Sequence, residues 1–126
     1  MARLIAIKAD IGRNLIHGDV SLAAVAARHG LSFRSVQRLF EREALTFTGF
    51  VLSQRLAYAY QLLVGAREDD RTICDTAFDA GFNDLSYFNR TFRRRYGVTP
   101  SEVREMSIAY SVLPRQRRMA SRSGQC

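Results

Sequence analysis

The chain has 126 residues, 47% of them hydrophobic, which excludes a disordered chain and suits one small domain or two very small ones that share an interface. Nineteen lysines and arginines oppose twelve aspartates and glutamates, for a formal net charge of +7, and Lys8 is the only lysine. An arginine-rich surface favours a polyanionic partner, most simply nucleic acid, over an ordinary soluble basic surface.

Apolar periodicity and capping residues predict four helices in the first half of the chain, over about residues 4–15, 22–29, 33–44 and 48–63. Ser21 and Ser32 are helix-capping residues, while Gly18 and Gly30 end the helices that precede them. The fourth helix is long, and its apolar face consists of Val51, Leu52, Leu56, Ala59 and Leu63.

The segment SFRSVQRLF, residues 32–40, forms the third of these helices and divides into two sides at 3.6 residues per turn. Its apolar side holds Phe33, Val36, Leu39 and Phe40. Its polar side holds Arg34, Gln37, Arg38 and Glu41.

The second half repeats the first after a polar connection, GAREDDR, at residues 65–71. SLAAVAARHGL (21–31) aligns with TICDTAFDAGF (72–82), and SFRSVQRLF aligns, after one inserted residue, with DLSYFNRTF (84–92). TPSE at residues 99–102 is a capping box with proline at the first helical position, so it opens a last helix.

An alanine stands four residues before the turn glycine in both copies, as Ala26 before Gly30 and as Ala77 before Gly81. Two short helices that cross over a tight turn need a small side chain where they touch, and a turn residue that accepts positive φ. The sequence therefore predicts two helix-turn-helix units. A generic helical bundle is the alternative and explains the expected core residues equally well, but it accounts less well for the Arg and amide groups that recur on both outward faces. Those core residues are Val36, Leu39, Phe40, Phe88 and Phe92.

The predicted fold is all-α, with about seven helices in two helix-turn-helix subdomains joined by a long linker helix. We expect a first subdomain with the linker helix over residues 1–64, a second subdomain over 65–110, and a basic disordered tail over 111–126. Arginines of this tail would add nonspecific attraction to a polyanion; they are Arg115, Arg117, Arg118 and Arg122.

SLAAVAARHGLSFRSVQRLFE and AFDAGFNDLSYFNRTFRRRYGVTPSEVR together resemble the DNA-binding domain of AraC/XylS-type bacterial transcription regulators, over about residues 4–106. The resemblance implies two helix-turn-helix units on double-stranded DNA, each with its second helix in the major groove. It also implies an activator that binds beside a promoter and contacts RNA polymerase.

The residues that the resemblance turns toward bases include Arg34 and Gln37, our first choices for direct readout, because Arg pairs with guanine and Asn or Gln with adenine. Phosphate contact is the alternative role for each of them. The full base-facing set is Arg34, Ser35, Gln37 and Arg38 in one groove, and Ser86, Tyr87, Asn89 and Arg90 in the next. The residues expected to contact the DNA backbone are Arg42, Arg93, Arg94 and Arg95.

A linker helix of about 16 residues spans roughly 24 Å, and major-groove faces recur about 34 Å apart. With the width of the units added, one chain can contact two successive grooves. Because the two polar faces differ in sequence, we expect an asymmetric site that needs no symmetric dimer.

Other chemistry finds little support. His17 and His29 have no metal or catalytic partner at useful spacing, Asp69, Asp70 and Asp75 suit caps or loops, and Cys74 suits a small packed residue. Cys74 and Cys126 are too few for a disulfide framework or a zinc site. We find neither a nucleophile–base pair nor a phosphate-binding glycine loop, so we predict no catalysis, no cofactor and no metal. No apolar run reaches the length of a membrane span and no signal peptide is visible, which predicts a cytoplasmic protein without membrane contact.

Two features depart from the family pattern. Ala44 stands where the second half has Gly97, so the first exit turn should be weaker or differently shaped. Family members usually carry a separate effector-sensing or dimerisation domain, which this sequence does not show. We therefore expect either a stand-alone member or, as we favour, the C-terminal part of a longer regulator. Two other classes of function remain open: a nonspecific nucleic-acid binder that uses its charge alone, and a protein-interaction module without a DNA role.

Overall fold

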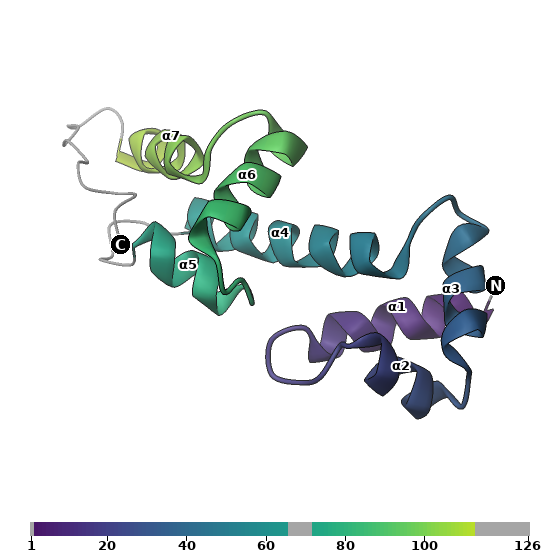
Figure 1. The fold of residues 1–126 in the computed structure, drawn as a ribbon. Coiled ribbons are helices and arrows are strands. Elements are labelled where there is room, and N and C mark those ends of the chain that lie inside the picture. Colours follow the sequence, from purple (N-terminus) through teal and green to yellow (C-terminus); the bar gives the residue numbers. More distant parts are fainter. Residues whose placement is uncertain (1, 66–71, 113–126) are drawn as a thin grey trace. The chain divides into compact units, whose positions relative to one another are not determined.

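The computed structural model describes residues 2–65 and 72–112, and within these ranges it is all-α, as predicted. Seven helices follow one another within these described ranges (Figure 1). They are α1 (Ala2–Asn14), α2 (Leu22–His29), α3 (Phe33–Glu41), α4 (Phe47–Gly65), α5 (Ile73–Asp79), α6 (Leu85–Tyr96) and α7 (Pro100–Val112).

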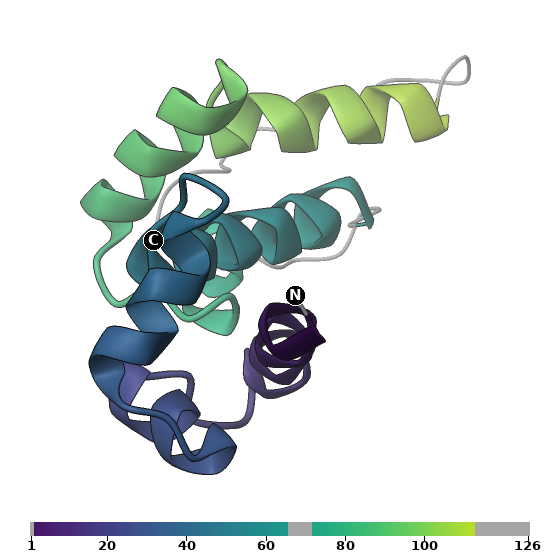
Figure 2. The same ribbon diagram turned by 90° about the vertical axis from the view of Figure 1, so that its right-hand side faces the viewer.

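The chain divides into two compact units, Met1–Arg55 and Leu56–Cys126, here called unit 1 and unit 2. Helix α4 begins in unit 1 and ends in unit 2. In unit 1, α2 and α3 pack on each other and on α1, while in unit 2 α6 packs on α5 and α7. Figure 2 shows α7 turning away from α6 at the connection between them. None of the described helices is long and apolar enough to cross a membrane.

The helix-turn-helix of unit 1 forms where the sequence predicted it. The Ser21 hydroxyl accepts a hydrogen bond from the Ala24 backbone N–H, and Ser32 accepts one from Ser35. Gly30 takes the left-handed conformation, with φ 66°, and the following N–H bonds back to the carbonyl of Ala26. Ala26 is buried at the crossing, which confirms the need for a small side chain there.

The helix-turn-helix of unit 2 has the same features: capped helices, a small buried residue and a turn glycine with positive φ. Thr72 and Asp75 form a reciprocal capping box at the start of α5, which confirms that Asp75 serves as a cap. Ala77 is buried, and Gly81 has φ 98° in the turn. The side chain of Asp84 then caps α6. Thr99 and Glu102 bond to each other's backbone N–H at the start of α7, so the predicted second capping box is present too.

The cores of the two units differ in composition. In unit 1, Phe40 is fully buried and lies 5.7 Å from Phe47 and 5.5 Å from Phe50, measured between ring centroids. In unit 2 a continuous row of rings leads from the turn to α4; the neighbouring pairs are Phe82–Phe88, Phe88–Phe92, Phe92–Tyr96 and Tyr96–Tyr60. Aromatic contacts therefore tie α4, α6 and the α5–α6 turn together within unit 2.

The predicted place of Phe33 was wrong. Its side chain is 54% exposed, although the 3.6-residue period placed it on the buried side of α3. Phe33 is the first residue of that helix, one turn ahead of Val36, which is fully buried. Leu39, also expected in the core, is only half-buried. The periodicity identified the buried side of α3 but not how far the neighbouring helices cover it.

The turns that follow α3 and α6, here called the exit turns, place different residues in the left-handed conformation. Helix α3 ends at Glu41, three residues earlier than predicted, and Ala44 then adopts φ 59°, the left-handed conformation that Gly97 adopts after α6 with φ 80°. The Leu45 N–H bonds to the Phe40 carbonyl and closes the turn. The predicted equivalence of Ala44 and Gly97 is thus confirmed, and the first turn differs in shape because α3 stops before it.

The predicted connection at 65–71 and the predicted tail at 111–126 lie almost entirely outside the described residues. Only the ends of these two segments are described: Gly65 is the last residue of α4, and α7 continues into the predicted tail as far as Val112.

Candidate nucleic-acid interface

The polar side of α3 is presented to solvent as predicted. Arg34, Gln37 and Arg38 are exposed and Ser35 is half-exposed, whereas Val36 on the opposite side is fully buried. The buried side fixes the rotation of the helix, so the polar residues must face outward together. Arg34 and Arg38 lie about one turn apart on this exposed side.

The polar side of α6 follows the same register. Ser86, Tyr87, Asn89 and Arg90 are exposed, and Phe88 and Phe92 behind them are fully buried. Each predicted base-facing set therefore lies on one side of one helix, on a rigid element rather than a loop. Side chains of this kind offer donors and acceptors to base edges.

Ser35 differs from its neighbours because its hydroxyl already has a partner. The Ser32 hydroxyl donates to the Ser35 oxygen over 3.0 Å, and the Ser35 backbone N–H donates to the Ser32 oxygen over 3.0 Å. One acceptor site of Ser35 is therefore occupied, while its own proton stays available for an external acceptor.

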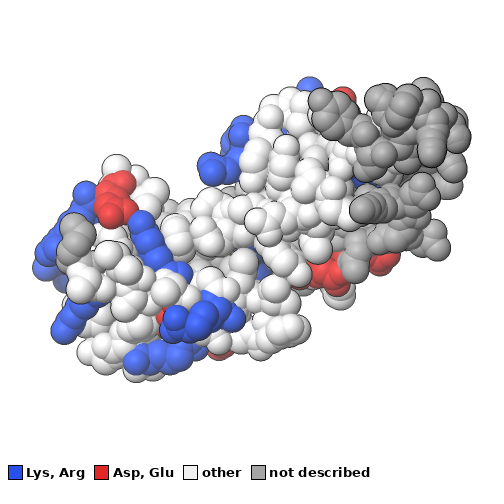
Figure 3. Space-filling view, turned by 180° about the vertical axis from the view of Figure 1, so that it is seen from behind, with Lys and Arg blue, Asp and Glu red and all other residues white. Residues whose placement is uncertain are grey.

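The arginines expected at the DNA backbone are also exposed. Arg42 follows the last residue of α3, and Arg93, Arg94 and Arg95 form the last turn of α6. The Arg95 guanidinium lies over the ring of Tyr96, with Cζ 5.7 Å from the ring centroid. On the face of unit 1 that Figure 3 shows, basic side chains lie at several separate places.

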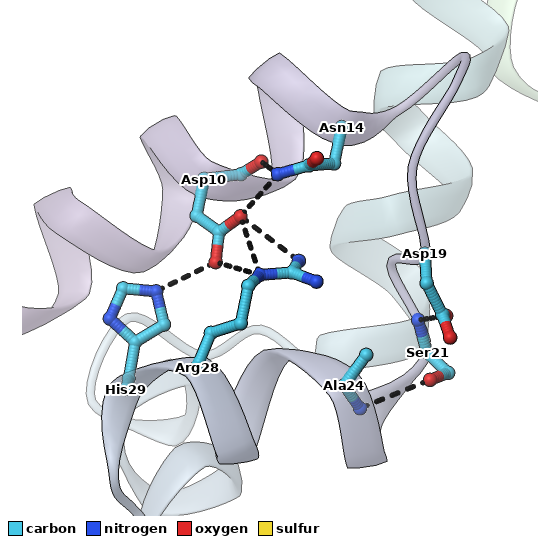
Figure 4. A network of polar contacts seen from close by, with 7 residues as sticks. All are labelled: Asp10, Asn14, Asp19, Ser21, Ala24, Arg28 and His29. Carbon is cyan, nitrogen blue, oxygen red and sulfur yellow. Dashed lines mark hydrogen bonds and ion pairs between the residues drawn. The ribbon is translucent and has the colours of Figure 1, made fainter.

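A buried carboxylate in unit 1 was missed by the sequence reasoning. Asp10 of α1 is 3% exposed and accepts hydrogen bonds from three side chains (Figure 4). Asn14 Nδ2 lies 2.6 Å from Asp10 Oδ1, Arg28 Nε lies 3.0 Å from Oδ2, and His29 Nε2 lies 2.7 Å from Oδ2. His29, expected to be isolated, thus joins α2 to α1.

Two opposing effects act on the pKa of the Asp10 carboxyl. Burial raises it, but hydrogen bonds from Arg28 and His29 and the charge of Arg28 outweigh burial, so the pKa lies below its ordinary value of 3.8. The carboxylate is therefore ionised at neutral pH and holds α2 in place. The sequence signal was available, because Asp10 falls on the same side of its helix as Ile7 and Ile11.

In the described part of the chain, no group of three or more His, Cys, Asp or Glu side chains could hold a metal ion. His29 is engaged with Asp10, and His17 is exposed. Cys74, predicted to be a small packed residue, is a half-buried free thiol.

A family model described as a helix-turn-helix domain matches residues 25–106, which is most of the chain. The transcriptional activator RhrA of Rhizobium meliloti is 43% identical over 107 residues, which cover 85% of this chain and 34% of RhrA. The chain belongs to the AraC/XylS family of helix-turn-helix DNA-binding domains. This is a family of transcription factors and not of enzymes.

Solved structures agree on the fold of this AraC/XylS domain. A probable AraC family regulator from Rhodopseudomonas palustris superposes with a TM-score of 0.75 at 26% identity, over 85% of this chain and 98% of that one. The DNA-binding domain of AdpA, a global transcriptional factor solved in complex with a target DNA, gives a TM-score of 0.70 at 23% identity, over 90% of this chain and 97% of that one. The chain spans about a third of the length of RhrA, and its likeness to RhrA concerns that part alone.

Proposed function

We propose that this protein is a sequence-specific DNA-binding transcription regulator, an activator, whose helices α3 and α6 enter two successive major-groove segments of a promoter. The observation that supports this most is the doubled arrangement of α3 and α6. In both helices a fully buried apolar side sets the rotation, and an exposed side presents arginine, an amide and serine. RhrA is named a transcriptional activator, and the AdpA domain was solved with its target DNA, which fits this proposal.

The two polar faces are unlike, so the proposed site is asymmetric. Arg34, Ser35, Gln37 and Arg38 would face one segment, and Ser86, Tyr87, Asn89 and Arg90 the next. Arginine can pair with both major-groove acceptors of guanine, and Gln37 or Asn89 can pair with adenine. Arg42, Arg93, Arg94 and Arg95 would contact phosphates, which add affinity without specificity.

Double-stranded DNA is thus the proposed partner, with RNA polymerase as the second partner of an activator bound beside a promoter. Such a role places the protein in the cytoplasm.

A selection of bound sites from random duplex DNA tests the proposal. Affinity for the selected duplex and for a scrambled duplex is then measured over a range of salt concentrations. Binding to both should weaken with salt, because phosphate contacts release counterions. The selected duplex should stay tighter at every salt concentration. Equal affinities would favour the nonspecific binder, and no binding at low salt would favour a protein-interaction module.

Arg34→Ala separates base reading from charge. If Arg34 reads a base, its loss should cost about 1–3 kcal/mol at one base position. Arg13→Ala is the matched control, since Arg13 is an exposed arginine on α1. The control removes the same charge from the same unit and should lower affinity slightly and for all sequences alike. A uniform loss with Arg34→Ala would make that residue a phosphate contact.

A further inference from the structure

Tyr87 is held at three points within unit 2, two on its backbone and one on its ring. Its backbone N–H donates to the Asp84 carboxylate over 3.1 Å, and its carbonyl accepts from the Thr91 hydroxyl over 2.9 Å. The ring itself lies 6.3 Å from the ring of Phe82, between centroids. Phe82 is only 5% exposed and packs on Phe88, so the ring of Tyr87 lies against the buried aromatic core at a tilt. The position of this exposed ring is therefore set by the core and by the cap of α6.

Arg90 lies one helical turn beyond Tyr87 and is in contact with that ring. Its guanidinium carbon is 5.7 Å from the ring centroid, within the range of a cation–π interaction. In the described part of the chain, no carboxylate forms an ion pair with Arg90. The aromatic ring is thus the side chain that restricts the guanidinium.

We propose that Tyr87 is a positioning residue, which holds the Arg90 guanidinium ready for a guanine edge. Bidentate pairing needs the planar guanidinium in one orientation, and ordering a free arginine on binding costs side-chain entropy. A guanidinium held by Tyr87 has lost part of that entropy before DNA arrives. The inference rests on the proposed function of α6 and assigns Tyr87 an action through Arg90 instead of a base contact of its own.

Helix α3 provides an internal contrast, because the repeat aligns Tyr87 with Ser35 and Arg90 with Arg38. The serine hydroxyl bonds to Ser32 and has no ring to hold an arginine. In the described residues, Arg38 has no aromatic neighbour of this kind. Arg38 should therefore discriminate its base less sharply than Arg90 discriminates its own.

The DNA test compares four variants on duplexes that carry every single-base change of the selected site: Tyr87→Phe, Tyr87→Leu, Arg90→Ala and the double variant Tyr87→Leu/Arg90→Ala. Leucine keeps an apolar side chain against Phe82 but removes the aromatic face, and phenylalanine keeps the face and removes the hydroxyl. We expect Tyr87→Leu to weaken discrimination about two- to fivefold at the base read by Arg90. Tyr87→Phe should stay within about twofold of wild type, and leucine should have no further effect once Arg90 is alanine.

Independent losses in the double variant, or a loss with Tyr87→Leu at a different base, would overturn the proposal, since Tyr87 would then contact DNA itself. Phe78→Leu is the matched control, because Phe78 is an exposed aromatic side chain of the same unit outside the proposed contact residues, and it should leave discrimination at every base unchanged. Thermal unfolding of each variant shows whether the fold is intact.

A measurement without DNA separates this inference from the proposed function. NMR relaxation of the Arg90 Nε–Hε group should show greater motion in Tyr87→Leu than in wild type, and little change in Tyr87→Phe. Unchanged motion in Tyr87→Leu would overturn the positioning role even if DNA recognition is confirmed. If the wild-type protein shows no sequence preference, the proposed function fails, while the relaxation result still decides whether Tyr87 orders Arg90.

Discussion

The two helix-turn-helix units share a plan but are held together by different chemistry. Unit 1 joins α1 to α2 through a buried carboxylate, Asp10, which accepts from Arg28 and His29. Unit 2 is built around stacked and tilted rings, with Phe92 between Phe88 and Tyr96. An aromatic core depends little on pH, whereas an ionic contact depends on the charge of its carboxyl. The two units therefore share the path of the backbone but are stabilised by different side-chain contacts.

The outward faces differ in charge as well. At equivalent positions in the repeat, α3 carries Glu41 where α6 carries Arg93. Helix α6 then continues with Arg94 and Arg95, which places positive charge at the helix C-terminus, where it interacts favourably with the helix dipole. We expect α6 to contribute more of the phosphate contacts than α3.

Phe92→Ala should give the largest effect on stability, because Phe92 is fully buried and contacts rings from both α4 and α6. Truncation of a core phenylalanine costs about 3–5 kcal/mol. All five tyrosines of the chain lie in unit 2, and there is no tryptophan, so tyrosine fluorescence reports the denaturant unfolding of that unit alone. Phe78→Ala is the control, since Phe78 is 69% exposed and its loss should change stability by under about 0.5 kcal/mol. Similar losses for both variants would contradict the aromatic core.

Asp10→Asn should destabilise unit 1 by about 2 kcal/mol, because the buried network loses its charge and one acceptor, although Arg28 can still reach solvent. Unit 1 contains no tyrosine, so the change should appear in denaturant unfolding followed by far-UV circular dichroism, and less in tyrosine fluorescence. Asp19→Asn removes an exposed carboxylate that accepts from Ser21 and should have a much smaller effect. A stability equal to wild type would show that the Asp10 contacts do not hold the unit.

The pH dependence of stability should distinguish the units further. Since the pKa of Asp10 is lowered in the folded protein, its contribution is complete above the ordinary value of 3.8 and is lost as pH falls through the lower folded-state value. Unfolding followed by circular dichroism should show this acid loss in wild type and less of it in Asp10→Asn. The variant should keep some acid dependence, because hydrogen bonds with Ser21 also lower the pKa of Asp19. An unchanged pH profile in the variant would contradict the assigned role of Asp10.

Substitutions in the two turns that follow α3 and α6 should have the smallest effects on stability, and the effects should have opposite signs. Ala44→Gly should stabilise the protein by about 0.5–1 kcal/mol, because glycine takes positive φ without the Cβ strain that alanine bears. Gly97→Ala should destabilise it by about 1 kcal/mol, because alanine would be strained at the positive φ of Gly97. Steric overlap adds nothing to this cost, because a Cβ at Gly97 would meet no atom within 4 Å. Thermal unfolding of both variants measures the pair. Changes of the same sign would show that the turns are not equivalent.

Local features were predictable from the sequence because they depend on neighbouring residues. The caps at Ser21, Ser32 and Thr99, the turn glycines and the small residue at each helix crossing all follow from short-range hydrogen bonds and sterics. The exposure of Phe33 was not predictable, because it depends on how far another helix extends over α3. Two of the three partners of Asp10, Arg28 and His29, lie 18 and 19 residues away, a separation that no local pattern specifies.

The candidate interface could be predicted as two exposed faces, because a strongly apolar side fixes the rotation of each short helix. What each face contacts, and the part that Tyr87 plays beside Arg90, require the positions of side chains in space.

The central claim is that α3 and α6 read different segments of one DNA site. Affinities of wild type, Arg34→Ala and Arg90→Ala for every single-base change of the selected duplex test it most directly. We predict that Arg34→Ala relaxes the preference at a base in one segment and Arg90→Ala at a base in the other, about one helical turn away. Loss of preference at the same base in both variants, or at no particular base in either, would contradict it.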